Sequence, residues 1–187
     1  MNMSKKVLVP IADGSEEIEA VCLIDVLRRA GAQVTVASVN ELHVTMSRGV
    51  KLAADTLIAA CVNETYDLIA LPGGMPGAEH LRDSPELIAL LTRQQKEGRL
   101  YAGICAAPVV VLKHHQLLGQ RRATCHPGFA ERLDNQAAVN ERVVVDGNLV
   151  TSRAPGTAIE FALKLVELLF DAQQAQKVAQ PMLAAKE

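Results

Sequence analysis

Short apolar runs rich in β-branched residues alternate with helix-patterned segments along this chain. We expect four of these runs to be buried strands, at residues 5–12, 33–39, 66–74 and 100–105. Their apolar residues are continuous rather than alternating with polar ones, which is typical of parallel strands covered on both faces. The pattern therefore predicts an α/β fold with a doubly wound, mostly parallel sheet and helices on both of its faces.

The segments between and after these runs predict the remaining elements. Helices are expected at residues 15–31, 84–98, 106–115 and 156–173, and further strands at 121–127 and in hairpins within 43–55 and 142–152. In the first helix, Ile18, Val21 and Cys22 belong to the apolar stripe that we expect to face the core. In the last helix, Ile159 is expected to lie on the corresponding stripe.

Composition excludes several classes of function. The chain has 187 residues, which suits one domain spanning residues 1–187, and a net charge of −2 without a basic run. Nothing therefore points to binding of nucleic acid or of an anionic membrane. The four cysteines show no paired spacing and we find no export signal, so we expect free thiols in the cytoplasm. No spaced set of ligands predicts a metal site, and no phosphate-binding glycine motif predicts a nucleotide cofactor.

Three expected strands are followed by loops that carry acidic residues, glycines or a cysteine. These loops are IADGSEEIE after the first strand, LPGGMPG after the third and GICAAP after the fourth. In open parallel sheets, ligands bind outside the carboxyl ends of the strands. We therefore expect the site of this protein at that edge of the sheet.

Cys105 lies at the joint between an expected strand and an expected helix. It could be an inert small hydrophobic residue, as many buried cysteines are. A sharp strand-to-helix turn would instead expose it as a nucleophile. Backbone N–H groups from Ala106 onward lack intrahelical partners, and together with the helix dipole they favour a thiolate. On this geometry we expect the thiol pKa to lie below its ordinary value of about 8.5.

Six segments together resemble the ThiJ/PfpI superfamily, and within it the DJ-one branch and its bacterial members. They are ADGSEE, SRGVKLAAD, LPGGMPGAEHLRDS, AGICAAPVVVL, ATCHPG and TSRAPGTAIEFAL. The resemblance implies a flavodoxin-like sandwich related to class I glutamine amidotransferases, and a cytoplasmic homodimer that needs no cofactor. It also implies a cysteine-dependent deglycase or glyoxalase acting on glyoxal- and methylglyoxal-derived adducts or the free 2-oxoaldehydes. The alternative that it implies is a redox-sensing chaperone.

The resemblance assigns roles to particular residues of this chain. Cys105 matches the nucleophile, and Glu19 matches the carboxyl group that hydrogen-bonds its sulfur. A buried Glu has a raised pKa and can stay protonated near neutrality. Backbone donors of an oxyanion pocket are matched by Gly73, Gly74 and Ala106.

Other matched positions carry weaker signals. His126 matches the active-site histidine of the family, although a His before Pro-Gly is commonly a turn residue. Arg29 and Arg48 match basic residues that hold an anionic group, or are two solvated arginines. We expect Glu16 and Glu17 to be solvated acids of the first helical turn.

The sequence also departs from some members of the superfamily. The residue after Cys105 is Ala106, where amidases and peptidases of the superfamily have a histidine beside or opposite the cysteine. Hydrolysis of an amide needs such a base, so an amidase or peptidase is the less favoured function. Peripheral cysteines of the human member are replaced by Met46 and Ala53, which weakens the case for thiol regulation at the dimer edge. Enzyme and redox chaperone both use one reactive thiol, so the sequence leaves both open.

Overall fold

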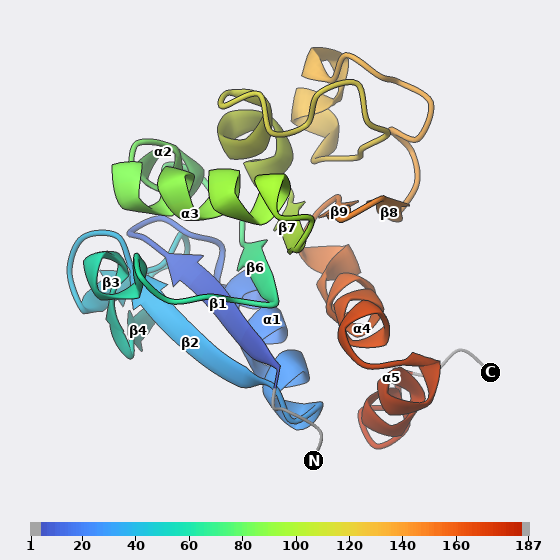
Figure 1. Cartoon of the computed structure of the whole chain (residues 1–187), viewed down its shortest axis with the longest axis horizontal. Helices are drawn as coiled ribbons and strands as arrows, with labels where there is room; N and C mark the ends of the chain where they lie inside the picture. The colour runs from blue at the N-terminus through green and yellow to red at the C-terminus, as the bar shows by residue number, and fades with distance from the viewer. Residues whose placement is uncertain (1–4, 185–187) are drawn as a thin grey trace.

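A seven-stranded sheet forms the centre of the computed structural model, which describes residues 5–184 (Figure 1). In spatial order its strands are β5 (Thr56–Leu57), β2 (Gln33–Ser38), β1 (Lys6–Ile11), β6 (Leu68–Leu71), β7 (Leu100–Ile104), β9 (Leu149–Ser152) and β8 (Val143–Asp146). All neighbours are parallel except β8 and β9, which form the predicted hairpin. With the short outer strands β5 and β8 set aside, the order is that of a flavodoxin-like sheet. The predicted fold class is confirmed.

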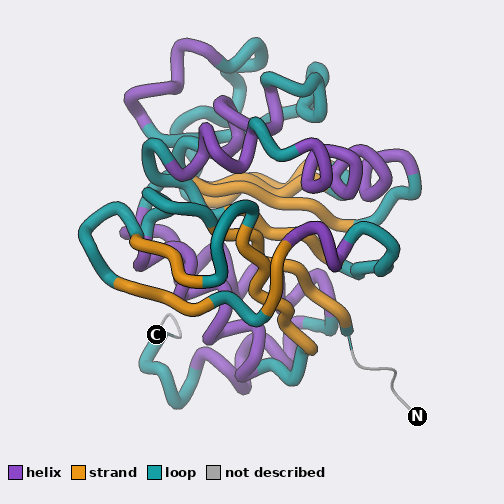
Figure 2. Tube along the Cα trace, turned by 90° about the vertical axis from the view of Figure 1, so that its left-hand side faces the viewer, coloured by secondary structure: helices purple, strands orange, loops and turns teal. Residues whose placement is uncertain are grey.

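Helices cover both faces of this sheet (Figure 2). One face carries α1 (Glu17–Arg29), α4 (Ala158–Leu169) and α5 (Ala172–Ala179), and the other carries α2 (Gly77–Arg82), α3 (Pro85–Lys96) and the π-helical segment η2 (Pro108–Lys113). Outside these layers lie the two-stranded sheet of β3 (His43–Thr45) and β4 (Lys51–Ala53) and the 3-10 turns η1 (Ile58–Cys61), η3 (Pro127–Arg132) and η4 (Pro155–Thr157).

The two cores follow from the alternation of side chains along each strand. In β1, Val7, Val9 and Ile11 pack with α1 and α4, whereas Leu8 packs with α2 and α3 on the opposite face. All four side chains are fully buried. Because both faces are covered, such a strand reads as one continuous apolar run, which is why the sequence revealed it.

The strand predicted at residues 121–127 is wrong. Two of its backbone donors bond side chains instead: Arg122 N–H donates to the carboxylate of Asp146 (2.8 Å), and Thr124 N–H donates to the hydroxyl of Thr151 (2.9 Å). The adjacent strand β9 already pairs with β7 and β8, so it has no free edge for a further strand. The predicted helix at 106–115 is helical, but with the wider π-helical turn of η2.

The apolar stripes predicted for the first and last helices are also partly wrong. Ile18, Val21 and Ile159 are 54%, 44% and 41% exposed, and Cys22 is half-buried. The buried face of α1 instead includes two acids, Glu17 and Glu19. The core-facing side of this helix therefore carries chemistry as well as packing.

The segment after α4 packs against the domain. Asp171 caps α5, and Val178 and Ala179 are 4% and 6% exposed. The sequence left the order of this tail open; residues 185–187 lie outside the described part. Among residues 5–184, no helix combines the length and apolarity needed to cross a lipid bilayer.

Two leucines of α4 offer a matched test of the core. Leu165 is fully buried and Leu168 is 38% exposed on the same helix. We expect Leu165→Ala to lower the free energy of unfolding by about 2–5 kcal/mol, because it removes buried methyl groups and leaves a cavity. Leu168→Ala is expected to cost a small fraction of that. Urea unfolding of both variants measures the difference, and equal losses would contradict the packing described for α4.

Candidate active site

Three loops meet at the carboxyl edge of the sheet. They are residues 12–16 after β1, residues 72–76 after β6, and the turn at Cys105 after β7. Because β1, β6 and β7 are adjacent and parallel, their carboxyl ends lie side by side. The chain leaves β1 toward β2 on one side, while β6 lies on the other, so a crevice opens at this point.

Glycines let these loops approach one another at backbone distance. A Cβ on Gly73 would lie 2.7 Å from Cys105 Cβ, and one on Gly74 would lie 2.5 Å from the Glu16 nitrogen. Gly74 also has φ +86°, in the left-handed region that favours glycine. Glu16 N–H donates to Gly73 O at 3.0 Å, which joins the first loop to the second. No larger residue fits at either glycine without moving the cysteine or the start of α1.

Cys105 occupies a strained backbone position. Its φ is +65°, a conformation that costs a non-glycine residue energy and clusters at functional sites. Its N–H donates to Ser152 O (3.1 Å), and its carbonyl accepts from His126 N–H (2.8 Å), so both sides of the turn are held. The side chain is almost buried, with 9% of its surface exposed. This strained strand-to-helix turn has the geometry expected for a nucleophile elbow.

Glu19 lies on the core-facing side of α1 and is fully buried. Its Oε2 accepts a hydrogen bond of 2.8 Å from Gly73 N–H. Its Oε1 is buried and, among the described residues, accepts no hydrogen bond, while the Cys105 side chain lies beside the same carboxyl group. The Gly73 N–H therefore holds Glu19 rather than facing a substrate. Of the predicted oxyanion donors, Gly74 and Ala106 direct their N–H groups at the Cys105 sulfur.

Burial raises the pKa of both members of this pair. Loss of water raises the pKa of Glu19 to about 7, with a further rise from the charge of Glu16, against a fall caused by the Gly73 hydrogen bond. Loss of water and the neighbouring Glu19 charge raise the pKa of Cys105 to about 12, although the N–H groups of Gly74 and Ala106 oppose the rise. The expected low thiol pKa is therefore wrong in direction. Burial outweighs the helix N-terminus.

The two groups share one negative charge between them. The Cys105 pKa is raised in part because Glu19 is ionised beside it, so a thiolate is favoured only once Glu19 is protonated. Above a pH of about 7 the pair carries one charge and one proton. That proton can move between Sγ and the carboxylate, which makes Glu19 suited to act as the general base for this thiol.

His126 is held at the same turn. Besides the bond of its N–H to Cys105 O, its Nδ1 accepts from Gly128 N–H at 3.1 Å. An Nδ1 that accepts cannot carry the proton, so the neutral ring is protonated at Nε2. The ring of Phe129 meets the imidazole edge-on, with 6.2 Å between ring centres. His126 is thereby set to donate through Nε2.

A cavity of about 580 Å³ opens above the cysteine. Its walls come from six separate segments and comprise Glu16, Ile18, Ser47, Arg48, Gly74, Met75, Cys105, Ala106, His126, Phe129 and Pro155. The structure thus brings Cys105, Gly74, Ala106, His126 and Arg48 of the predicted set to one cavity. Gly73 and Glu19 lie directly beneath it.

Arg29 is not part of this arrangement. It lies in the last turn of α1, ten residues beyond Glu19 and therefore about 15 Å along the helix from the site. Its guanidinium pairs with Asp25 at 2.6 Å on an exposed surface. Arg29 is therefore a solvated arginine, and the structure does not support the role at the pocket that the family resemblance implied for it.

Glu16 and Glu17 are not the solvated acids that were expected. Glu16 caps α1, because its carboxylate accepts from Glu19 N–H at 2.8 Å. Glu17 is 8% exposed and accepts from the Ser47 hydroxyl (2.6 Å) and from Arg48 N–H (2.7 Å). Partial burial raises the pKa of Glu17, but these hydrogen bonds prevail and hold the pKa below its ordinary value. The sequence pattern did not identify Glu17 as the acid that fixes the Arg48 turn over the cavity, because the partners of Glu17 lie far away in sequence.

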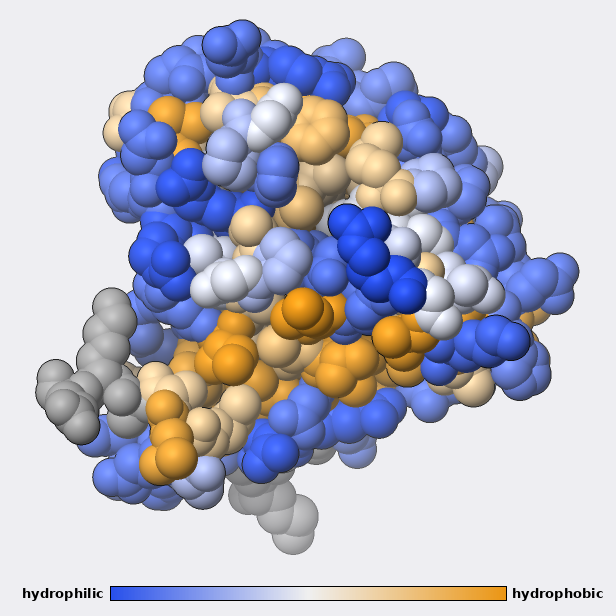
Figure 3. Space-filling model, turned by 180° about the vertical axis from the view of Figure 1, so that it is seen from behind, coloured by the Kyte–Doolittle hydropathy of each residue, from blue (hydrophilic) through white to orange (hydrophobic). Residues whose placement is uncertain are grey.

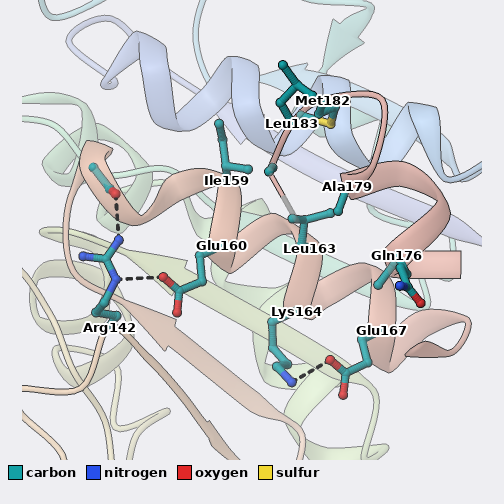
Figure 4. Close-up of a pocket in the computed structure, with 13 residues that line it drawn as sticks. Arg142, Ile159, Glu160, Leu163, Lys164, Glu167, Gln176, Ala179, Met182 and Leu183 are labelled. Carbon is teal, nitrogen blue, oxygen red and sulfur yellow. Dashed lines mark hydrogen bonds and ion pairs between the residues drawn. The ribbon is translucent and has the colours of Figure 1, made fainter. Parts of the chain in front are cut away.

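A second hollow of about 550 Å³ lies between α4 and α5 (Figure 4). Its charged side chains point at one another: Arg142 pairs with Glu160 at 2.7 Å and Lys164 with Glu167 at 2.6 Å. None of the predicted site residues lines it. Within residues 5–184, no group of three His, Cys, Asp or Glu side chains is placed to hold a metal ion.

The raised thiol pKa predicts the effect of one substitution. Glu19→Gln removes the negative charge beside Cys105 but keeps the size of the side chain, so the thiol pKa should fall below that of the wild type. Titration of thiolate absorbance in protein whose other cysteines are serine measures this shift. Glu17→Gln is the matched control on the same helical turn and should leave the Cys105 titration unchanged. A thiol pKa that stays constant or rises in Glu19→Gln would refute the shared charge.

Comparison with known proteins identifies the family of this chain. The model of the DJ-1/PfpI family matches residues 5–168. Protein DJ-1 homolog B of Arabidopsis thaliana is 46% identical over 95% of this chain, which spans 41% of that relative's length. The glutathione-independent glyoxalase DJR-1.2 of Caenorhabditis elegans is 36% identical, with 98% of this chain and 97% of the relative covered.

A solved structure is similar over its full length. Toxoplasma gondii DJ-1, in a structure described as oxidized, superposes with a TM-score of 0.95 at 53% identity, covering 98% of this chain and 100% of that one. The match of the family model and the length and identity of these alignments agree with the fold. The chain belongs to the DJ-1/PfpI family.

Proposed function

We propose that this protein is a cofactor-independent, cysteine-dependent glyoxalase or deglycase that converts 2-oxoaldehydes, or their adducts on proteins, to 2-hydroxy acids. The observation that carries the proposal is the buried pair of Glu19 and Cys105 at the floor of a cavity, with the N–H groups of Gly74 and Ala106 directed at the sulfur. A thiol with an adjacent base suits attack on a carbonyl that is already electrophilic.

The first step forms a carbon–sulfur bond. Sγ of Cys105 attacks the aldehyde carbon while the thiol proton passes to the Glu19 carboxylate, and the carbonyl π electrons move to oxygen. Gly74 and Ala106 N–H groups, which already face the sulfur, stabilise the resulting oxyanion, which then takes up a proton to give a hemithioacetal.

The second step moves a proton from the former aldehyde carbon to the neighbouring ketone carbon. A base removes the first proton, and the Nε2–H of His126 donates a hydrogen bond to the ketone oxygen, so that an enediol forms. Return of a proton to the second carbon gives a thioester. Water then hydrolyses the thioester, which releases the hydroxy acid and restores the thiol. The net reaction adds one water and consumes no cofactor.

The same chemistry extends to adducts. A hemithioacetal or hemiaminal on a protein side chain releases its aldehyde to Cys105, and the hydroxy acid leaves together with the repaired thiol or amine. The name of the Caenorhabditis elegans relative, a glutathione-independent glyoxalase, supports the reaction on free 2-oxoaldehydes. Arg48 lines the cavity wall, and in this proposal its guanidinium attracts the carboxylate of the product.

Two Cys→Ser variants test the proposal. We expect wild-type protein to form lactate from methylglyoxal, and Cys105→Ser to lose this turnover. Cys22→Ser, which removes a half-buried thiol outside the cavity, should keep it. Glu19→Gln should lower kcat by about two to four decades, the usual contribution of a general acid or base. Turnover that persists in Cys105→Ser would overturn the proposal.

A redox role is the second candidate. The oxidized Toxoplasma gondii relative and the N–H groups directed at the Cys105 sulfur favour it, because those donors would also stabilise a sulfinate. One peroxide would convert the thiol to a sulfenic acid and a second to a sulfinic acid, with one water released each time. A wild-type protein without turnover of methylglyoxal would favour this role over the enzyme.

We further propose that the chain is a cytoplasmic homodimer. The four cysteines are free, as expected in a reducing compartment. Apolar side chains gather in a band across the face shown in Figure 3. Large exposed apolar side chains include Ile18 and Val21 of α1 and Ile159 of α4, and these two helices pack together. Such a patch supports a protein–protein interface.

A charge in this band tests the dimer. We expect the wild type to sediment at twice the chain mass of 20.1 kDa, and Val21→Glu to sediment as a monomer because a buried unpaired carboxylate destabilises an interface. Leu57→Glu, an equally exposed change on β5, is the control and should remain dimeric. A monomeric wild type would contradict this part of the proposal.

A further inference from the structure

The wall of the catalytic cavity is divided by chemistry. The start of α1 and the turn after β3 contribute the polar side chains of Glu16, Ser47 and Arg48, together with the single apolar side chain of Ile18. Three other segments contribute apolar side chains: Met75 from the loop after β6, Phe129 from η3 and Pro155 from η4. A reacting carbonyl at Cys105 therefore has a polar wall available to its oxygens and an apolar wall available to its substituent.

The cavity is larger than a three-carbon aldehyde needs. Its volume of about 580 Å³ lies in the range that holds drug-sized ligands, roughly 300–1,000 Å³. Methylglyoxal would bury one methyl group there and leave the apolar wall largely wet. Binding energy from an apolar substituent becomes available only if the substituent reaches that wall.

Met75 and Phe129 are attached directly to the catalytic elements. Met75 follows Gly74, whose N–H faces the Cys105 sulfur, and its side chain is 43% exposed. Phe129 lies three residues after His126, and its ring contacts the imidazole. An exposed methionine is flexible and polarizable, and it adapts to aromatic groups in particular. The adaptable side chain of Met75 thus lies next in sequence to an N–H group that faces the sulfur. The aromatic side chain of Phe129 contacts the imidazole of His126.

We infer that the cavity selects 2-oxoaldehydes whose ketone carbon bears an aromatic or bulky apolar substituent over methylglyoxal, with Met75 and Phe129 as the residues that determine this specificity. The inference rests on the proposed function, since it concerns the substrate of the same site. The aldehyde carbon lies at Cys105, and the substituent extends between Met75 and Phe129. An apolar group buried in such a wall improves recognition by about tenfold or more.

Binding of products tests the inference without turnover. Mandelate is the hydroxy acid formed from phenylglyoxal, and lactate is the one formed from methylglyoxal. Calorimetry with wild-type protein should give a Kd for mandelate about tenfold or more below that for lactate. Met75→Ser and Phe129→Ala should each remove most of this difference, whereas Leu57→Ser, an exposed apolar residue outside the cavity, should preserve it. Equal affinities in the wild type would overturn the inference.

Enzyme kinetics supply a second test of the inference. The ratio of kcat/KM for phenylglyoxal to that for methylglyoxal should fall about tenfold in Met75→Ser and in Phe129→Ala, relative to the wild type and to Leu57→Ser. Comparing ratios cancels the intrinsic reactivities of the two aldehydes. A ratio unchanged in both variants would overturn the specificity. If the wild type converts neither aldehyde, the proposed function fails, and the binding of mandelate against lactate then decides the inference by itself.

Discussion

Burial of a carboxyl group next to a thiol is the constraint on which this site depends. Glu19 is fully buried, accepts a hydrogen bond from Gly73 N–H, and lies beside the Cys105 side chain. Two negative charges cannot coexist there, so the pair keeps a proton and one charge over a wide range of pH. Chemistry on an electrophilic carbonyl needs this combination, because a nucleophile and its base must both be present in one protonation state of the pair.

The fold supplies the pair through its topology. Parallel order brings the ends of β1, β6 and β7 together, and α1 starts immediately after the first of these loops. Gly73 and Gly74 then allow the second loop to pack against both the cysteine turn and the start of α1. The hydrogen bond from Glu16 N–H to Gly73 O and the Glu17 contacts to the Arg48 turn complete the enclosure. Removal of water from Glu19 is thus a consequence of how three loops pack, and it sets the pKa of both groups.

The sequence predicted the parts of this arrangement that depend on local pattern. Continuous apolar runs identified the parallel strands, and the strand–helix joint identified Cys105 as an elbow residue. The prediction of a strand at residues 121–127 failed because strand pairing depends on whether a neighbouring strand has a free edge. The local sequence pattern carries no information about that edge. Glu17 was missed because its partners Ser47 and Arg48 are distant in the chain. The thiol pKa was predicted in the wrong direction, since the helix N-terminus is visible in sequence and the degree of burial is not.

The protonation of Glu19 tests this account most directly. Carbon-13 NMR of the side-chain carboxyl groups, assigned by comparison with Glu19→Gln, reports the titration of this residue alone. The account predicts a midpoint at a pH of about 7, because burial disfavours the carboxylate. A midpoint at the ordinary glutamate value of about 4.3 would mean that Glu19 is ionised and solvated at neutral pH. That result would contradict the desolvation of Glu19 and, with it, the raised pKa that suits this carboxylate to accept the thiol proton of Cys105.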